Sequence, residues 1–197
     1  MMGAVISKAY SQPPVCQKEI LRYAGCKDAD KDILKLTTEC INEAKDKISY
    51  KLCYSEFDVK VENNICDFGV CKFASKDLAT NLRGCTKAVL FAATLGAEFD
   101  RLVAKYSRLS PAKALMLEAL GNERIEALCD AFCEDIKAEF GTPLKPRFSA
   151  GYGDLPLDTQ RNIFALLDCE RRIGLTLNDS LLMSPSKSVT AFVGITE

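Results

Sequence analysis

The sequence predicts a mixed α+β domain, and three observations support this fold class. Apolar residues three or four positions apart recur over long stretches, which is typical of helices with one buried face. A nearly continuous apolar run over 87–94 is typical of a buried strand. Further strand patterns precede and follow that run, so the strands fall in at least two blocks separated by helices. The 197 residues suit a single domain over 1–197, and 48% hydrophobic residues argue against disorder.

The first part of the chain divides into a helical N-terminal segment over 1–49 and the start of an α+β core over 50–197. Its predicted elements are helices over 17–23 and 30–48, a strand over 50–61, a turn at 62–64, a hairpin partner over 65–73 and a short helix over 76–82. Ser75 directly precedes the short helix, and its hydroxyl is expected to cap it.

The second part of the chain continues this alternation. Its predicted elements are the buried strand over 87–94, helices over 97–107 and 110–140, a helix from Asp158 to Ile173 and an interrupted pair of strands over 181–195. Ser110 and Pro111 mark the start of the long helix, because a capping hydroxyl followed by proline suits a first helical turn. The helix is expected to bend or be interrupted at Gly121 and Asn122, and Asp158 is the expected cap of the next helix.

The composition excludes several classes of mechanism. The chain has no His, which excludes Ser-His-Asp and Cys-His catalysis, metal sites ligated by His and His proton shuttles. A net charge of −1 gives no electrostatic argument for nucleic-acid binding. The N-terminus lacks the pattern of a signal peptide, and no apolar stretch is long enough to cross a bilayer. We therefore expect a cytoplasmic protein that binds neither nucleic acid nor membranes.

Ten cysteines leave two interpretations open. No pair has the spacing C-x-x-C, whereas Cys129 and Cys133 would lie one turn apart on a helix, which is also the spacing of core residues. Free thiols that pack as small apolar residues are the favoured interpretation, and no metal site is predicted. A thiol-based metal or redox protein is the other interpretation.

The loop over 146–154 is the strongest candidate for a binding site. Its sequence, PRFSAGYGD, combines one Arg, two aromatic residues and two Gly between two helices. Arg147 can pair with a carboxylate through two hydrogen bonds, and Tyr152 offers a stacking face and a hydroxyl. Glycine lets the backbone approach a ligand closely. An ordinary connection between helices, with Phe148 and Tyr152 packed inward, explains the same residues. The turn over 93–96 and the polar segment over 184–188 are weaker candidates.

Four motifs follow one another over the last fifty residues. They are RFSAGY over 147–152, LLDCE over 166–170, GLTLNDSLLM over 174–183 and PSKSV over 185–189. Together they resemble the activation domain of cobalamin-dependent methionine synthase, which has an Arg-Pro-x-Pro-Gly-Tyr loop, a Leu-Leu-Asp/Glu-x-Glu helix, a Gly-(Met/Leu)-x-Leu-(Thr/Asn)-(Glu/Asp)-Ser-x-x-Met segment and a Ser-rich strand. Their order and spacing are more specific than any one motif.

The resemblance implies a curved, mostly antiparallel sheet with helices packed around it. It implies binding of S-adenosylmethionine, whose methyl group restores cobalamin after accidental oxidation, once an electron donor such as flavodoxin reduces it. Carried over residue by residue, Arg147 would hold the methionine carboxylate, and Ser149, Ala150, Gly151 and Tyr152 would contact the rest of the ligand. No catalytic side chain is implied, because a sulfonium is already an activated methyl donor.

The chain departs from the family pattern in ways that shape two hypotheses. Phe148 and Ala150 replace both prolines of the loop, and the sequence ends at Glu197, where the family continues into a further strand and helix. Cobalamin-binding domains of this family place a His beneath cobalt in an Asp-x-His-x-x-Gly motif, so a partner protein is expected to carry the cobalamin. The first hypothesis is a free-standing reactivation component for a methionine synthase or a related corrinoid methyltransferase, a methyltransferase component if it is an enzyme. The alternative is a non-catalytic docking partner of a corrinoid protein that has lost S-adenosylmethionine binding.

Overall fold

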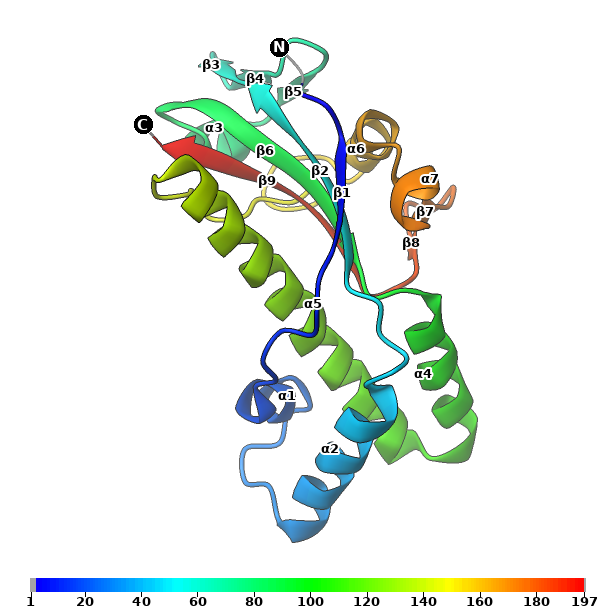
Figure 1. Cartoon of the computed structure of the whole chain (residues 1–197). Helices are drawn as coiled ribbons and strands as arrows, with labels where there is room; N and C mark the ends of the chain where they lie inside the picture. Colours follow the sequence, from blue (N-terminus) through cyan, green and yellow to red (C-terminus); the bar gives the residue numbers. More distant parts are fainter. Residues whose placement is uncertain (1–2, 197) are drawn as a thin grey trace.

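A four-stranded antiparallel sheet runs through the upper part of the molecule in Figure 1. The computed structural model describes residues 3–196. The strands occur in the order β1 (Ile6–Ala9), β2 (Lys51–Asp58), β6 (Cys85–Thr94) and β9 (Ser188–Thr196). The mixed α+β class, with antiparallel sheets and packed helices, is thereby confirmed.

β6 forms the centre of this sheet, as its apolar sequence predicts. It pairs with β2 on one side and with β9 on the other, so that Leu90 lies between Ser55 and Phe192. The last seven residues of β6 are all buried, because helices and loops cover both faces of the sheet. Two separate hydrophobic clusters therefore form, one on each face.

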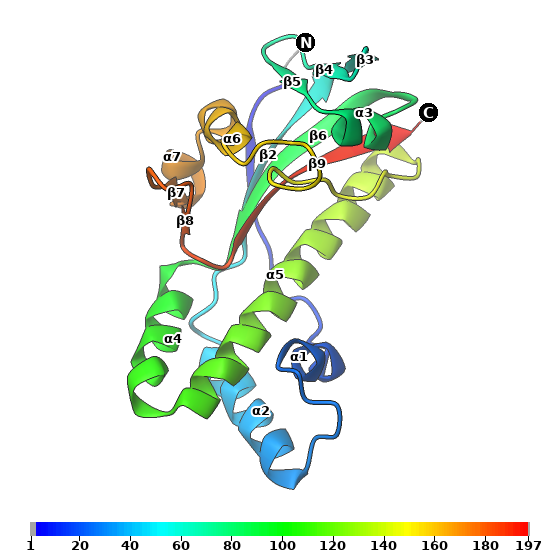
Figure 2. The ribbon, with the colours of Figure 1, turned by 180° about the vertical axis from the view of Figure 1, so that it is seen from behind.

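One face of the sheet is covered by a long helix that also reaches well beyond it (Figures 1 and 2). This helix, α5 (Pro111–Phe140), packs its upper half on the sheet. Its lower half packs against three helices, α1 (Gln17–Tyr23), α2 (Lys31–Ala44) and α4 (Ala97–Leu109), with which it forms what we call the helical lobe. Both halves belong to one hydrophobic cluster, which joins the helical lobe to the sheet.

The opposite face of the sheet is covered by short elements. They are the helices α3 (Lys76–Asn81), α6 (Thr159–Leu167) and α7 (Cys169–Ile173), a small sheet of β3 (Lys60–Glu62), β4 (Ile65–Asp67) and β5 (Lys72–Ala74), and the hairpin of β7 (Thr176–Leu177) and β8 (Met183–Ser184). Four aromatic contacts join Phe57, Phe68, Phe73 and Phe192 in this layer, and the ring centroids of Phe73 and Phe192 are 5.2 Å apart. This second cluster holds the short elements against the sheet.

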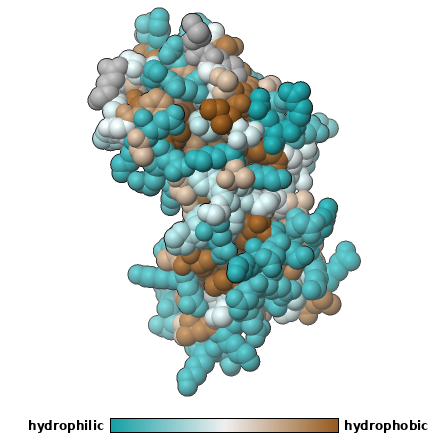
Figure 3. All heavy atoms as spheres, viewed as in Figure 1, coloured by the Kyte–Doolittle hydropathy of each residue, from teal (hydrophilic) through white to brown (hydrophobic). Residues whose placement is uncertain are grey.

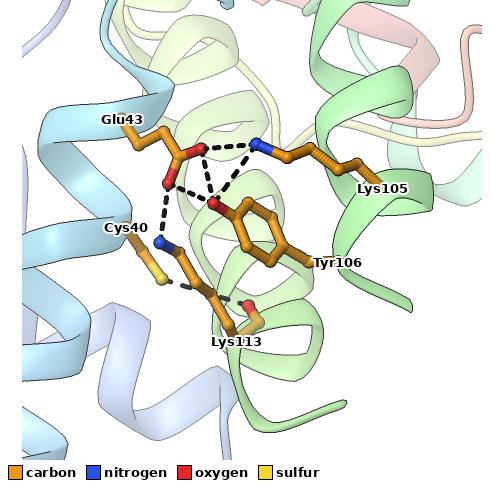
Figure 4. A network of polar contacts seen from close by, with 5 residues as sticks. All are labelled: Cys40, Glu43, Lys105, Tyr106 and Lys113. Atoms are coloured by element: carbon orange, nitrogen blue, oxygen red, sulfur yellow. Dashed lines mark hydrogen bonds and ion pairs between the residues drawn. The ribbon is translucent and has the colours of Figure 1, made fainter. Parts of the chain in front are cut away.

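A polar network joins three helices of the helical lobe (Figure 4). The two oxygens of the Glu43 carboxylate on α2 lie 2.7 and 2.9 Å from the Tyr106 hydroxyl, which donates a hydrogen bond to the carboxylate. The carboxylate also forms an ion pair with Lys113 at 2.6 Å. Lys105 approaches the same carboxylate at 3.4 Å. The hydrogen bond with Lys113 is the main cause that lowers the pKa of Glu43 to about 2.

A buried ion pair on α5 fixes the chain just before α1. Arg124 and Glu123 are 1% and 4% exposed and form an ion pair with each other. The Arg124 guanidinium donates hydrogen bonds to the carbonyl oxygens of Pro13 and Pro14 at 2.6 and 2.7 Å, and the Cys16 amide donates to Glu123 at 2.9 Å. The pair is thus fully hydrogen-bonded, as buried charges require.

Most predicted elements are confirmed, and several details differ. The strand predicted over 50–61 is divided between β2 in the main sheet and β3 in the small sheet, and the strand predicted over 65–73 is divided between β4 and β5. The N-terminal segment is helical over α1 and α2, but Ile6–Ala9 forms an edge strand. The predicted helix from Asp158 to Ile173 is divided into α6 and α7, because Asp168 adopts a left-handed conformation between them. The expected cap at Asp158 is not formed, since its side chain makes no capping hydrogen bond. Gly121 does not interrupt α5.

The interrupted pair of strands predicted over 181–195 is confirmed as β8 and β9. β8 pairs with β7, and β9 lies at the edge of the main sheet. The Ser75 cap is confirmed, since its hydroxyl accepts a hydrogen bond from the Leu78 amide.

The surface in Figure 3 narrows between the sheet and the helical lobe, and its apolar patches are small and separated by polar residues. Within residues 3–196, no helix has both the length and the apolar character needed to cross a membrane.

Candidate functional site

A cleft of about 680 Å³ lies along the outer edge of β9. Its walls come from α5 on one face of the sheet, from α6 on the other face, and from the loop that connects the two helices. The lining residues are Glu126, Asp130, Cys133, Leu144, Lys145, Pro146, Arg147, Ser149, Ala150, Tyr152, Gln160, Met183, Ser188, Val189 and Thr190. Four of the five predicted site residues therefore line one cleft.

Arg147 is the charged centre of this cleft. Its guanidinium forms ion pairs with Asp130 at 2.5 Å and with Glu126 at 2.6 Å, both on α5. These carboxylates lie four residues apart, so they project from the same face of the helix. Burial alone would lower the pKa of the Arg147 guanidinium. The hydrogen bond with Asp130 and the other polar groups beside Arg147 outweigh this effect, so the pKa is raised. The side chain of Arg147 remains 26% exposed, so a ligand in the cleft can reach it.

The loop is attached to the sheet at the position where the family has its first proline. The Phe148 amide donates to the Phe192 carbonyl oxygen at 2.9 Å, and the Phe192 amide donates back at 2.8 Å. Proline has no amide hydrogen and could not make the first of these bonds. The hydrogen-bonded pair therefore anchors the loop beside Arg147 in the absence of the prolines.

Asp154 anchors the far end of the loop to α3. Its carboxylate accepts hydrogen bonds from the Lys76 amide at 2.8 Å, the Asp77 amide at 3.1 Å and the Ser75 hydroxyl. The bond from Ser75, followed by those from the two amides, lowers the pKa of Asp154. The loop is thus held at both ends, by β9 and by the first turn of α3.

The remaining predicted site residues have different positions. Tyr152 is 62% exposed at the rim of the cleft, with its ring edge-on to Phe148 at 6.3 Å. Ser149 and Ala150 line the cleft, whereas Gly151 is not among the lining residues. Gly151 has φ +90°, which favours glycine, and its amide donates to the Leu155 carbonyl oxygen at 2.9 Å. In this structure its role is to turn the chain.

Sequence reasoning missed the cleft residues that come from other elements. Glu126 and Asp130 were hidden in a long helix, where acidic residues usually face solvent, and only their i, i+4 spacing relates them. Gln160 and Thr190 carry no sequence signal of their own. The topology brings both next to the loop, because β9 lies at the sheet edge that the loop covers.

The two weaker candidate segments make internal contacts. In the turn over 93–96, the Gly96 amide donates to the Thr94 hydroxyl at 3.2 Å, and a β-carbon on Gly96 would lie 2.2 Å from the Ser49 hydroxyl oxygen. In the segment over 184–188, the amide and hydroxyl of Ser186 donate to Asp100 at 2.7 and 2.9 Å. The two segments also contact each other, since the Leu95 amide donates to the Lys187 carbonyl oxygen at 3.0 Å, and together they connect β6, α4 and β9.

The cysteines are free thiols throughout the described chain. Cys129 is buried in the core, and burial raises the pKa of its thiol. Cys133 lies beside Arg147 and lines the cleft, and burial raises its pKa as well. Residues 3–196 contain no group of three or more potential metal ligands among Cys, Asp and Glu.

Comparison with known proteins identifies the fold. No protein-family model and no curated protein matches the sequence. Among solved structures, the chain is similar to the crystal structure of the MetH reactivation domain bound to AdoHcy, with a TM-score of 0.71 and 14% sequence identity. The chain has the fold of the MetH reactivation domain. The match covers 98% of this chain and 78% of the other, so the reactivation-domain fold includes the helical lobe as well as the sheet and its cleft.

Proposed function

We propose that this chain is a reactivation component for a cobalamin-dependent methionine synthase or a related corrinoid methyltransferase, and that its cleft binds S-adenosylmethionine. The observation that carries the proposal is the grouping of Arg147, Glu126 and Asp130 in a cleft at the edge of β9. Two further observations support it: the motifs over 147–189 resemble this family, and the solved structure with the same fold contains AdoHcy.

The charges of the cleft suit the amino-acid end of S-adenosylmethionine. That end carries one carboxylate and one ammonium group, so it needs a cationic and an anionic partner close together. Arg147 supplies the cation, with planar geometry that matches a carboxylate, and Glu126 and Asp130 supply the anions. On binding, the ligand would take over part of the ion pairing that these three side chains now share.

The chemistry needs position rather than an acid or a base from this chain. A cobalamin reduced by an electron donor such as flavodoxin would supply the electron pair that accepts the methyl group, and the sulfur of the ligand would keep the electron pair of the broken sulfur–carbon bond. The contribution of the cleft is to hold the sulfonium in a fixed orientation. The exposed rim at Tyr152 leaves the ligand open to an approaching partner.

The cobalamin would be carried by a partner. The 197 residues contain no His, which the family uses beneath cobalt. In the proposal, therefore, a corrinoid protein presents its cofactor to the cleft in trans.

Isothermal titration calorimetry with S-adenosylmethionine tests the binding proposal. The wild type is expected to bind, and Arg147→Ala is expected to weaken binding by about 10- to 100-fold, through loss of a charged hydrogen-bonded partner. Arg171→Ala is the matched control, because Arg171 is an exposed arginine on α7, outside the cleft, that pairs with Asp168. Absence of binding by the wild type, or equal weakening by both variants, would overturn the assignment.

One observation favours the alternative of a non-catalytic docking partner. Arg147 is already neutralised by two carboxylates, so a ligand carboxylate has to compete with them. In this alternative, the domain covers a corrinoid protein without binding S-adenosylmethionine. A pull-down with the corrinoid protein decides between the two: association that is equal for wild type and Arg147→Ala, without any calorimetric binding, favours the docking partner.

A further inference from the structure

Two buried polar atoms in the cleft have no hydrogen-bond partner among the described residues. They are the side-chain oxygen of Gln160 and the hydroxyl oxygen of Thr190. Gln160 and Thr190 are only 5% and 2% exposed, and both line the cleft. Buried polar side chains in folded proteins are normally hydrogen-bonded, so two exceptions in one cleft require an explanation.

The two side chains lie on the same face of the sheet. Thr190 is two residues from Phe192 on β9, so both side chains point to the face covered by α6. Gln160 lies in the first turn of α6, whose buried residues Ile163 and Leu167 belong to the same cluster as Phe192. We call Gln160 and Thr190 the neutral wall of the cleft.

The neutral wall differs in place and chemistry from the charged wall, formed by Arg147, Glu126 and Asp130. The carboxylates of the charged wall come from α5, which covers the other face of the sheet (Figures 1 and 2). The cleft wraps around the edge of β9 and so combines an ionic half with an uncharged, hydrogen-bonding half. A ligand that satisfies both must itself have a zwitterionic end and a neutral polar end.

We propose that Gln160 and Thr190 bind the nucleoside half of the ligand and determine the specificity of the cleft for it. The inference rests on the proposed function, which places the amino-acid end of S-adenosylmethionine at the charged wall. A nucleoside offers neutral donors and acceptors on its base and hydroxyls on its ribose. A side-chain amide can present either a donor or an acceptor, and a threonine hydroxyl can act as both.

This arrangement would make the cleft selective. A site whose buried polar groups are completed only by the ligand rejects analogues that leave those groups unpaired. A compound with the amino-acid and sulfonium groups but no nucleoside would reach only the charged wall. The neutral wall thus provides the discrimination that the charged wall lacks.

Calorimetry with three probes tests the inference: S-adenosylmethionine, 5′-methylthioadenosine as the nucleoside half, and S-methylmethionine as the amino-acid half. Thr190→Val and Gln160→Met keep the side-chain volumes but remove the hydrogen-bonding atoms. Each is expected to weaken binding of the two nucleoside probes by about tenfold and to leave S-methylmethionine unchanged. Arg147→Ala is expected to weaken binding of S-adenosylmethionine and S-methylmethionine and to leave binding of 5′-methylthioadenosine unchanged.

Thermal unfolding distinguishes a binding role from a structural one. Because the Thr190 hydroxyl has no partner in the described chain, Thr190→Val is expected to melt at the same or a higher temperature than the wild type. Thr38→Val, on an exposed part of α2, is the control for loss of a threonine hydroxyl and should change no affinity.

The outcomes separate the inference from the proposed function. The inference fails if Thr190→Val and Gln160→Met fold and bind 5′-methylthioadenosine as tightly as the wild type does. The proposed function stands in that case if Arg147→Ala weakens binding of S-adenosylmethionine. The proposed function fails, and the neutral wall stands, if the wild type binds 5′-methylthioadenosine through these two residues but does not bind S-adenosylmethionine. Absence of binding by all three probes overturns both.

Discussion

Two arginines of the molecule both form ion pairs with carboxylates of α5 but lie in opposite environments. Arg124, in the helical lobe, is 1% exposed and is surrounded by one carboxylate and two backbone carbonyl oxygens. Arg147, in the cleft, has a side chain that is 26% exposed and pairs with two carboxylates that are themselves 44% and 70% exposed. The partners of Arg124 are parts of the structure, whereas those of Arg147 can be shared with a ligand. Exposure, rather than the presence of an ion pair, therefore distinguishes an arginine that is enclosed in the fold from one that a ligand could reach.

The largest expected effect is on stability, from Arg124→Met. The substitution leaves the Glu123 carboxylate buried without its partner, which is expected to lower the free energy of unfolding by about 3–5 kcal/mol. Arg147→Met is the matched variant in the cleft and should lower it by less than about 1 kcal/mol, because its partners are exposed to water. Urea unfolding measures both, and similar losses for the two variants would contradict the comparison.

An intermediate effect is expected where the loop of the cleft joins α3. Asp154→Ala removes the carboxylate that accepts from the Lys76 and Asp77 amides, so the free energy of unfolding should fall by about 1 kcal/mol. Because one end of the Arg147 loop is then released, we also expect weaker binding of S-adenosylmethionine. Asp179→Ala, in a loop beyond α7, provides an acidic control. Calorimetry that finds Asp154→Ala binding as tightly as wild type would show that the anchor is purely structural.

The smallest expected effect is the pH dependence that the Glu43 network confers. The pKa of the Glu43 carboxyl is about 2, below its usual value of 4.5. The ionised carboxylate therefore stabilises the fold above about pH 4.5, and this stabilisation is lost as the pH falls toward 2. The loss is expected to be below about 1 kcal/mol, because the Glu43 side chain is partly open to water. Glu43→Gln should unfold with a weaker dependence on pH over this range, as followed by circular dichroism. An unchanged dependence would mean that other carboxylates dominate it.

The sequence predicted the parts of the fold in which local signals agree with tertiary structure. The apolar run that became β6, the Ser75 cap and the proline start of α5 each depend on a few neighbouring residues. The edge strand β1 was missed because all four of its residues are exposed, so they show no alternation of apolar and polar residues. The break at Asp168 was missed because its conformation is left-handed, which only glycine signals clearly.

The candidate site was predictable only where it lies on one continuous segment. Arg147, Ser149, Ala150 and Tyr152 follow one another along a loop, and the structure places all four in the cleft. The other walls come from α5, α6 and β9, and the pairing that assembles them is between segments far apart in the chain. No local pattern specifies such pairing, because strand order follows from packing of the whole sheet.

The order of the strands has a consequence for synthesis of the protein on the ribosome. β6 leaves the ribosome before the strand that completes its second edge, β9, because the helices α4 to α7 are made between these two strands. Until then, an almost entirely apolar strand has one row of backbone amides and carbonyls unpaired, which is a template for association with other chains. The nascent chain is therefore most vulnerable to aggregation in the interval between these two strands, and the cleft is completed only when that vulnerability ends.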